Sequence, residues 1–145
     1  YREAIDSIAG NTYFAEKIDE WLKRLATVYN RGFWEGYYMG HKLGAWTKEP
    51  GSIATEKKIY IGKGTKYYPK IKVGEFIVET GSVKQGDTLL VTGPQVGMAR
   101  ETMETLTVNG VITDKAEKGD RITFPFETRV TVQDKLYKII SAADA

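Results

Sequence analysis

Two stretches of the chain, Val83-Lys84-Gln85-Gly86-Asp87-Thr88-Leu89 and Ala116-Glu117-Lys118-Gly119-Asp120-Arg121-Ile122, follow the same pattern. Each stretch places a glycine and an aspartate directly before a run of strand-forming residues. Glycine adopts the backbone conformation that a tight turn needs, and an aspartate beside it can accept hydrogen bonds from nearby backbone amides. The two stretches therefore predict turns that lead into strands, with Asp87 and Asp120 as turn formers rather than catalytic acids.

The rest of the chain from residue 55 onward alternates apolar and polar residues, which is the period of a β-strand. Turn residues separate the runs, and Asn109-Gly110 is the sharpest hairpin signal among them. Short strands at near-regular spacing predict a mainly β fold, namely a small antiparallel β-barrel that is closed or nearly closed. The expected strands cover residues 57–61, 71–78, 87–91, 102–108, 121–126 and 135–140.

The beginning of the chain has the period of a helix instead. Residues 2–9 are typical of the end of one helix, stopped by Gly10 and Asn11, and a second helix is expected from Thr12, its cap, to Asn30. Apolar residues at three- and four-residue steps give this second helix one apolar stripe. The stripe consists of Phe14, Ile18, Trp21, Leu22, Leu25 and Tyr29. Such a stripe needs a cover, either the barrel or a domain upstream.

Residues 30–51 form a bridge that combines aromatic rings with glycines. Rings of this kind need burial or a stacking partner, so a recognition loop and an aromatic plug both fit the pattern. We interpret four of them as interdomain packing residues, namely Phe33, Trp34, Tyr37 and Tyr38. The predicted organisation is a helical linker with this bridge over residues 1–51 and a C-terminal β-barrel domain over residues 52–145.

Composition limits the possible functions. Hydrophobic residues make up 41% and charged residues 28% of the 145 residues, which is typical of a globular protein. No apolar run approaches the roughly 20 residues of a membrane helix, and no signal peptide is evident, so we expect a cytoplasmic protein without a membrane partner. The chain has no Cys and one His, so we identify no catalytic residue and no metal site in it. Because it starts at Tyr1 inside a helical pattern, we expect it to come from a longer chain.

The best candidate for a binding site is a basic run with interleaved tyrosines. Lysine neutralises phosphate and tyrosine stacks on unpaired bases, the combination that binds single-stranded or loop RNA. Gly62 and Gly64 would let the backbone approach a phosphate. The alternative is that the lysines protect exposed strand edges. The predicted nucleic-acid-binding residues are Lys57, Lys58, Lys63, Lys66, Tyr67, Tyr68, Lys70 and Lys72.

Several motifs carry a resemblance to known families. The two Gly-Asp stretches and their order resemble the second domain of translational GTPases. A second resemblance covers nearly the whole chain. Its first part consists of Tyr1-Arg2-Glu3-Ala4-Ile5-Asp6, Asn30-Arg31-Gly32-Phe33 and Gly36-Tyr37-Tyr38-Met39-Gly40. Its second part consists of Tyr60-Ile61-Gly62, residues 83–89, Thr92-Gly93-Pro94 and Asp134-Lys135-Leu136-Tyr137. The motifs resemble peptidase family U32, often described as collagenase-like proteases: the first part looks like the region that leaves the catalytic barrel, and the second resembles the C-terminal β-barrel domain.

This resemblance implies a non-catalytic accessory domain of a larger enzyme. Some members of the family are linked to proteolysis, and others hydroxylate RNA bases, including the tRNA wobble uridine, with an iron–sulfur cluster held by cysteines of the catalytic domain. This chain has no Cys, so no cluster ligand transfers to it and we expect no cofactor within it. The expected partners are its own N-terminal catalytic domain and an RNA or protein substrate. A purely structural domain, or one that mediates a homodimer, is the alternative.

Overall fold

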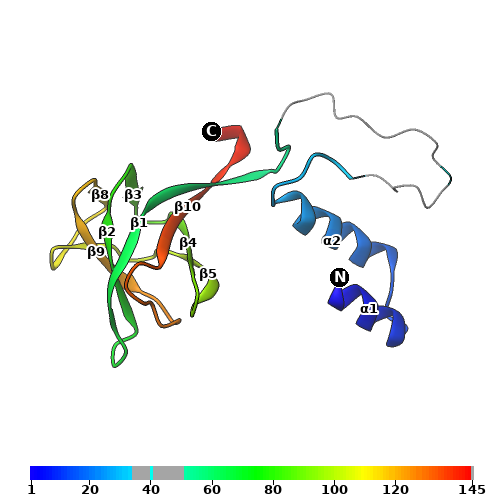
Figure 1. The fold of residues 1–145 in the computed structure, drawn as a ribbon, viewed down its shortest axis with the longest axis horizontal. Coiled ribbons are helices and arrows are strands. Elements are labelled where there is room, and N and C mark those ends of the chain that lie inside the picture. Colours follow the sequence, from blue (N-terminus) through cyan, green and yellow to red (C-terminus); the bar gives the residue numbers. More distant parts are fainter. Residues whose placement is uncertain (34–39, 41–50, 145) are drawn as a thin grey trace. The chain divides into compact units, whose positions relative to one another are not determined.

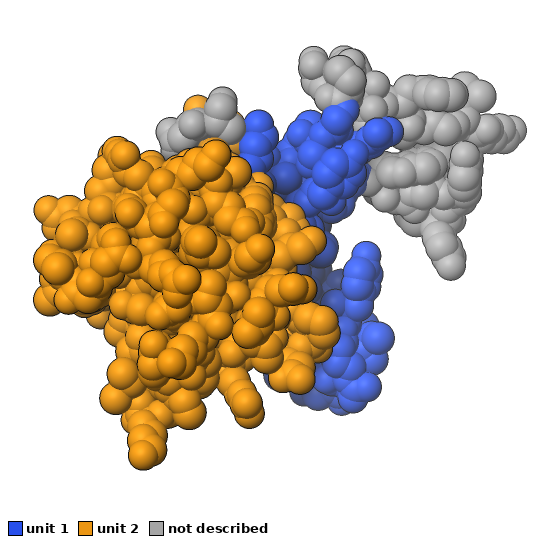
Figure 2. Space-filling view, turned by 60° about the vertical axis from the view of Figure 1, so that its left-hand side comes forward, with its two compact units in different colours: residues 1–57 blue, residues 58–145 orange. Residues whose placement is uncertain are grey.

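The computed structural model describes residues 1–33, 40 and 51–144. The chain divides into two compact units, a helical unit of residues 1–57 and a β unit of residues 58–145 (Figure 2). The sequence predicts a domain boundary between residues 51 and 52. This boundary refers to domains of the whole protein, not to the two compact units, and it stays a prediction.

The helical unit contains α1 (Arg2–Ala9) and α2 (Ala15–Ala26) (Figure 1). The prediction that Thr12 caps α2 is wrong, because Phe14 occupies the N-cap and the Thr12 hydroxyl donates to the Ser7 carbonyl at 3.5 Å. The helix also ends earlier than predicted. The Asn30 side chain donates a hydrogen bond to the carbonyl of Ala26, the last helical residue, at 3.3 Å. Asn30 thus lies beyond the helix and satisfies one of the carbonyl groups at its end.

The β unit is built from antiparallel strands (Figure 1). Eight strands form one sheet in the order β5-β4-β10-β1-β2-β9-β6-β7, and β3 pairs with β8 in a second sheet. A mainly antiparallel β fold is therefore confirmed. Among the described residues, no ladder joins β5 to β7, so these strands are the two ends of the hydrogen-bonded order. The strands are β1 (Glu56–Tyr68), β2 (Val73–Val78), β3 (Ser82–Lys84), β4 (Thr88–Gly93), β5 (Gly97–Thr102), β6 (Thr107–Val108), β7 (Val111–Ile112), β8 (Lys115–Glu117), β9 (Arg121–Pro125) and β10 (Lys135–Ser141).

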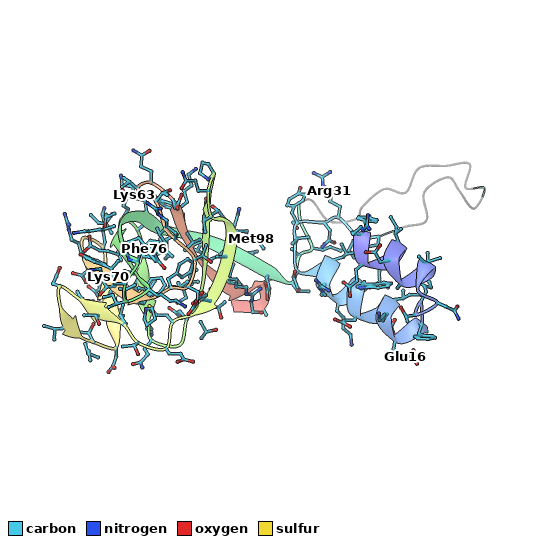
Figure 3. All side chains as sticks on the ribbon, turned by 90° about the horizontal axis from the view of Figure 1, so that it is seen from below. Glu16, Arg31, Lys63, Lys70, Phe76 and Met98 are labelled. Atoms are coloured by element: carbon cyan, nitrogen blue, oxygen red, sulfur yellow. The ribbon has the colours of Figure 1, made fainter. Side chains whose placement is uncertain are left out.

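Both sheets cover a single core. Val83 of β3 and Ala116 of β8 are fully buried in the same cluster as Phe76, Leu89 and Ile122 of the large sheet. The Phe76 and Phe124 rings stack at 5.1 Å, which fixes β2 against β9. Figure 3 shows Phe76 in the interior of the β unit. The alternation of buried and outward residues along β2 and β9 follows from this one-sided core.

The strand predicted over residues 102–108 is interrupted. Thr102 ends β5 and Thr107 begins β6, and the segment between them is not a strand. Met103 and Leu106 are both buried, although residues three apart in a strand point to opposite faces. The chain therefore turns between them so that both side chains reach the core.

The two Gly-Asp turns have the predicted hydrogen bonds. The Asp87 carboxylate accepts from the Lys84 backbone N–H at 2.7 Å, and the Asp120 carboxylate accepts from the Glu117 backbone N–H at 2.8 Å. In both turns the preceding glycine has a positive φ, +90° at Gly86. The role of Asp87 and Asp120 as turn formers is confirmed.

A third turn has the same geometry without the glycine. Asp134 accepts from the Thr131 backbone N–H at 2.7 Å, again three residues earlier. The residue before it, Gln133, has a φ of +76°. Val130 before this turn and Leu136 after it are buried, as are the equivalent apolar residues of the other two turns. The β unit thus contains three copies of one turn, each leading into a core strand.

Candidate functional site

Strand β1 carries most of the residues predicted to bind nucleic acid. Lys63 lies opposite Ile77, and Lys66 lies opposite Glu75. Opposite residues of an antiparallel pair project from one side, and Ile77 and Glu75 share a side because they are two apart on β2. Lys63 and Lys66 therefore share a face although three residues separate them, because a register shift at Thr65 restores the alternation. This side, turned away from the core, is called the outer face below.

Tyr67 lies on the opposite, inward side of β1. It is paired with Gly74, and it packs against the core. Its hydroxyl donates to the carbonyl oxygens of Phe126 at 3.1 Å and Glu127 at 3.2 Å. A ring held in this way supports the fold, and its role in binding nucleic acid stays a prediction.

Glu75 is the centre of a polar network on the outer face. Its carboxylate accepts hydrogen bonds from the Thr65 hydroxyl at 2.6 Å and from the Tyr68 hydroxyl at 3.4 Å. The Arg121 guanidinium of β9 lies 3.6 Å from the same carboxylate. The Lys66 ammonium group lies 4.9 Å from the centre of the Tyr68 ring, which is a cation–π distance. Lys66 and Tyr68, which were both predicted, are thus brought together.

A second network on the outer face connects β10 to β1 and to the end of β2. The Lys58 ammonium group lies 4.8 Å from the centre of the Tyr137 ring. Tyr137 meets Tyr60 edge to face at 5.6 Å. The Tyr60 hydroxyl donates to Glu79 at 2.5 Å, and Lys63 forms an ion pair with the same carboxylate at 2.9 Å. Tyr137 is a member that sequence reasoning missed, since only the pairing of β10 with β1 brings it here.

These contacts change the ionisation of two groups. The hydrogen bond to Glu79, helped by burial and the negative carboxylate, raises the pKa of Tyr60 to about 12. Conversely, the hydrogen bonds from Tyr60 and Lys63 lower the pKa of Glu79. Tyr60 therefore stays protonated and Glu79 stays charged through the neutral range.

The remaining predicted lysines do not belong to these two networks. Lys57 is exposed, and Lys70 is exposed in the connection between β1 and β2 (Figure 3). Lys72, which has a φ of +51°, forms an ion pair with Glu127 at 2.7 Å. This hydrogen bond to a carboxylate raises the pKa of Lys72.

The two glycines predicted to approach a phosphate are buried inside β1. A Cβ on Gly62 would overlap the Ile77 carbonyl, and one on Gly64 would lie 2.7 Å from the Thr131 carbonyl. The Gly64 N–H already donates to the Asp134 carbonyl at 2.7 Å. The phosphate interpretation of these glycines is therefore wrong, because protein backbone occupies the space that they leave.

The aromatic bridge is only partly within the described residues. Phe33 is described, with 55% of its surface exposed. Trp34, Tyr37 and Tyr38 lie outside the described residues. The interdomain packing assigned to these rings stays a prediction.

No metal centre is evident in the described part of the chain, where no three His, Cys, Asp or Glu side chains come together as ligands. Within the same residues, no helix has the length and apolar character to cross a membrane.

The fold defines a class of protein. The structure is similar to the C-terminal domain of a putative U32 peptidase from Geobacillus thermoleovorans, with a TM-score of 0.51 and 16% sequence identity. The similarity covers 55% of this chain and 90% of that domain. At this identity the likeness concerns the fold, which is that of a U32 peptidase C-terminal domain.

Sequence comparison leads to the relatives of the whole chain. A protein named collagenase from Porphyromonas gingivalis is 45% identical over 138 residues, 95% of this chain and 33% of that relative. An uncharacterized protease of Methanocaldococcus jannaschii is 32% identical over 140 residues, 94% of this chain and 34% of that protein. No family model matches the chain. The chain thus has homologues of the U32 collagenase type over most of its length, as its motifs predicted, and it spans about a third of their length.

Proposed function

We propose that the chain is a non-catalytic accessory region of a larger U32-type enzyme and that the outer face of its β unit docks the substrate. The observation that carries this proposal is the arrangement of Lys58, Tyr137, Tyr60 and Lys63 side by side on that face. Two strands that are distant in the sequence, β1 and β10, supply them. No catalytic role is assigned to any residue of this arrangement.

The chemistry of the outer face favours RNA as the substrate. Tyrosine rings next to ammonium groups offer stacking and phosphate neutralisation in one place. Lys58 and Lys66 each lie over a tyrosine ring, which leaves their charge available to a polyanion. Lys63 forms an ion pair with Glu79, so we expect it to contribute less to RNA binding than Lys58 and Lys66 do.

The test is a titration of the 145-residue chain with unmodified tRNA at two salt concentrations. The variant pair Lys58→Glu and Lys66→Glu reverses two charges of the outer face and should weaken binding at least tenfold. Lys118→Glu, an exposed lysine in the turn before β9, is the matched control and should leave binding nearly unchanged. Binding that does not respond to salt or to the pair would contradict RNA docking on this face.

Protein substrate is the second candidate, because relatives over almost the whole chain are named collagenase. Gelatin binding by the unmodified chain and by Tyr137→Ala distinguishes the two substrates. Loss of gelatin binding in Tyr137→Ala with no tRNA binding in the unmodified chain would favour a protease exosite.

The chemistry itself is proposed to reside outside this chain. An iron–sulfur cluster of the kind found in RNA-hydroxylating members requires cysteine ligands, and this chain has none. The residues present therefore do not fit such a cluster. An alternative role is packing against the rest of the enzyme or against a second copy. The feature of the chain that supports this alternative is the helical unit.

A further inference from the structure

The described residues of the helical unit form no apolar core of their own. Among its described residues, Ser7 alone is buried. Helix α1 has 8 residues and α2 has 12, and isolated helices shorter than about 12–15 residues are marginal in water. Helices of this length owe their stability to packing of their apolar sides, so a further surface must cover these two.

Helices α1 and α2 leave large apolar side chains uncovered. Ser7 of α1 is buried with its hydroxyl bonded to the Ala4 carbonyl at 2.8 Å. On the same helix, Ile5 and Ile8 are 62% and 64% exposed. Leu22 and Leu25 on the stripe of α2 are 44% and 38% exposed. These four residues are called the helical apolar face below.

Polar contacts hold the pair in a defined arrangement. Arg24 of α2 forms an ion pair with Glu3 of α1 at 3.1 Å. Beyond α2, the Ile53 N–H donates to the Asn30 carbonyl at 2.8 Å and the Thr55 N–H donates to the Ala26 carbonyl at 3.0 Å. The returning chain thus ties down the end of α2. The helical apolar face is presented by a connected unit and not by two independent helices.

We propose that the helical apolar face is covered by the part of the enzyme that lies outside this chain, so that α1 and α2 form the joint between the catalytic part and the β unit. This rests on the proposed function, because it requires a longer protein. The relatives supply the length, since two thirds of the collagenase relative lies outside the matched 138 residues. At least part of the helical unit lies within that match, which covers 95% of the chain.

A surface in the same polypeptide is favoured over a second copy. Its effective concentration is of the order of millimolar, far above that of a separate molecule in a dilute solution. The occupant is expected to be an apolar surface, because the four residues of the face are all aliphatic.

Hydrogen–deuterium exchange tests the proposal on the 145-residue chain and on a longer protein that includes the preceding catalytic part. Amides of residues 2–26 should exchange at least 100-fold more slowly in the longer protein. Amides of β2 and β9 provide the internal standard, since their protection arises within the β unit and should be equal in both proteins. In the longer protein, Ile8→Glu with Leu22→Glu should restore fast exchange over residues 2–26, whereas Lys23→Glu should not.

Equal protection of residues 2–26 in both proteins would overturn the proposal. So would a concentration-dependent dimer of the 145-residue chain that Ile8→Glu dissociates, because a second copy would then cover the face. Neither result depends on tRNA or gelatin binding by the outer face, so this proposal and the substrate-docking role can fail separately.

Discussion

Gly93 of β4 lies directly against the carboxylate of Asp134, so that a Cβ at Gly93 would lie 2.6 Å from the Asp134 carboxylate carbon. Asp134 is 1% exposed, and its two carboxylate oxygens accept from the backbone N–H and the hydroxyl of Thr131 at 2.7 and 2.8 Å. The absence of a side chain at position 93 therefore leaves room for the buried carboxylate that closes the third turn.

Gly93→Ala is expected to destabilise the β unit by about 2–3 kcal/mol, because the added methyl group displaces Asp134 and strains its hydrogen bonds. The midpoint of urea unfolding measures this change. Gly97→Ala, directly opposite Gly93 in the same hairpin, is the control. A Cβ there has open space but a φ of +64°, so only the left-handed conformation is penalised, by about 1 kcal/mol. Equal losses in the two variants would contradict the steric explanation.

Gln133→Gly is expected to stabilise the β unit by about 0.5 kcal/mol, because glycine relieves the cost of a left-handed residue but loses more entropy on folding. Gln133 is the counterpart of Gly86 and Gly119 in the other two turns. Gly119→Gln makes the opposite exchange and should destabilise the unit. Thermal unfolding of both variants provides the measurement. A loss of stability in Gln133→Gly would mean that the glutamine side chain contributes contacts beyond the turn.

The repeated turn shows how far the sequence predicts this fold. Gly86-Asp87 and Gly119-Asp120 identify two of the three turns, because a glycine before an aspartate is a local signal. The third turn escapes prediction because Gln133 has no such preference and is held at positive φ by tertiary contacts, among them its N–H bond to the Gly64 carbonyl at 3.1 Å. Local patterns predict turns that local chemistry stabilises, and they miss those that distant strands impose.

The candidate site, too, could be predicted from the sequence only in part. The lysines and tyrosines of β1 were predicted as one group because they are close in sequence, but strand alternation sends Tyr67 inward and Lys66 outward. The bulge at Thr65 that brings Lys63 and Lys66 to one face leaves no mark in the residue pattern. Tyr137 joins the face from a strand about 70 residues away, and only the strand order of an assembled sheet reveals this.

Tyr60 is expected to ionise near pH 12, well above the ordinary tyrosine value of 10.0. Because its pKa is raised in the folded protein, the hydrogen bond to Glu79 stabilises the fold below about pH 10 and loses this effect as the pH rises through about 12. The pKa of Glu79 is lowered, so its contribution is present above its ordinary value of 4.5 and is lost as the pH falls through the folded value.

Tyrosinate absorbance during alkaline titration measures the first of these effects. The highest-pH step should vanish in Tyr60→Phe and should move toward lower pH in Glu79→Gln, which keeps the shape of the side chain but removes its charge. A step that stays in place in Glu79→Gln would show that burial rather than the carboxylate raises the pKa.

Tyr67 and Tyr68 are expected to differ, although they are neighbours in sequence. Tyr67→Phe removes the donor to the carbonyls of Phe126 and Glu127 and should destabilise the β unit by about 1 kcal/mol. Tyr68→Phe gives up one long hydrogen bond on the outer face, so its effect on stability should stay within about 0.5 kcal/mol. Urea unfolding of the two variants measures this difference.

Binding of tRNA should show the opposite order. If the outer face docks RNA, Tyr68→Ala removes a stacking ring beside Lys66 and should weaken binding by about 1 kcal/mol or more, roughly fivefold. Tyr68→Phe keeps the ring and should bind normally, as should Tyr67→Phe, whose ring faces the core. Weaker binding in Tyr67→Phe than in Tyr68→Ala would mean that RNA contacts the hairpin from the other side and that the outer face is not the docking surface.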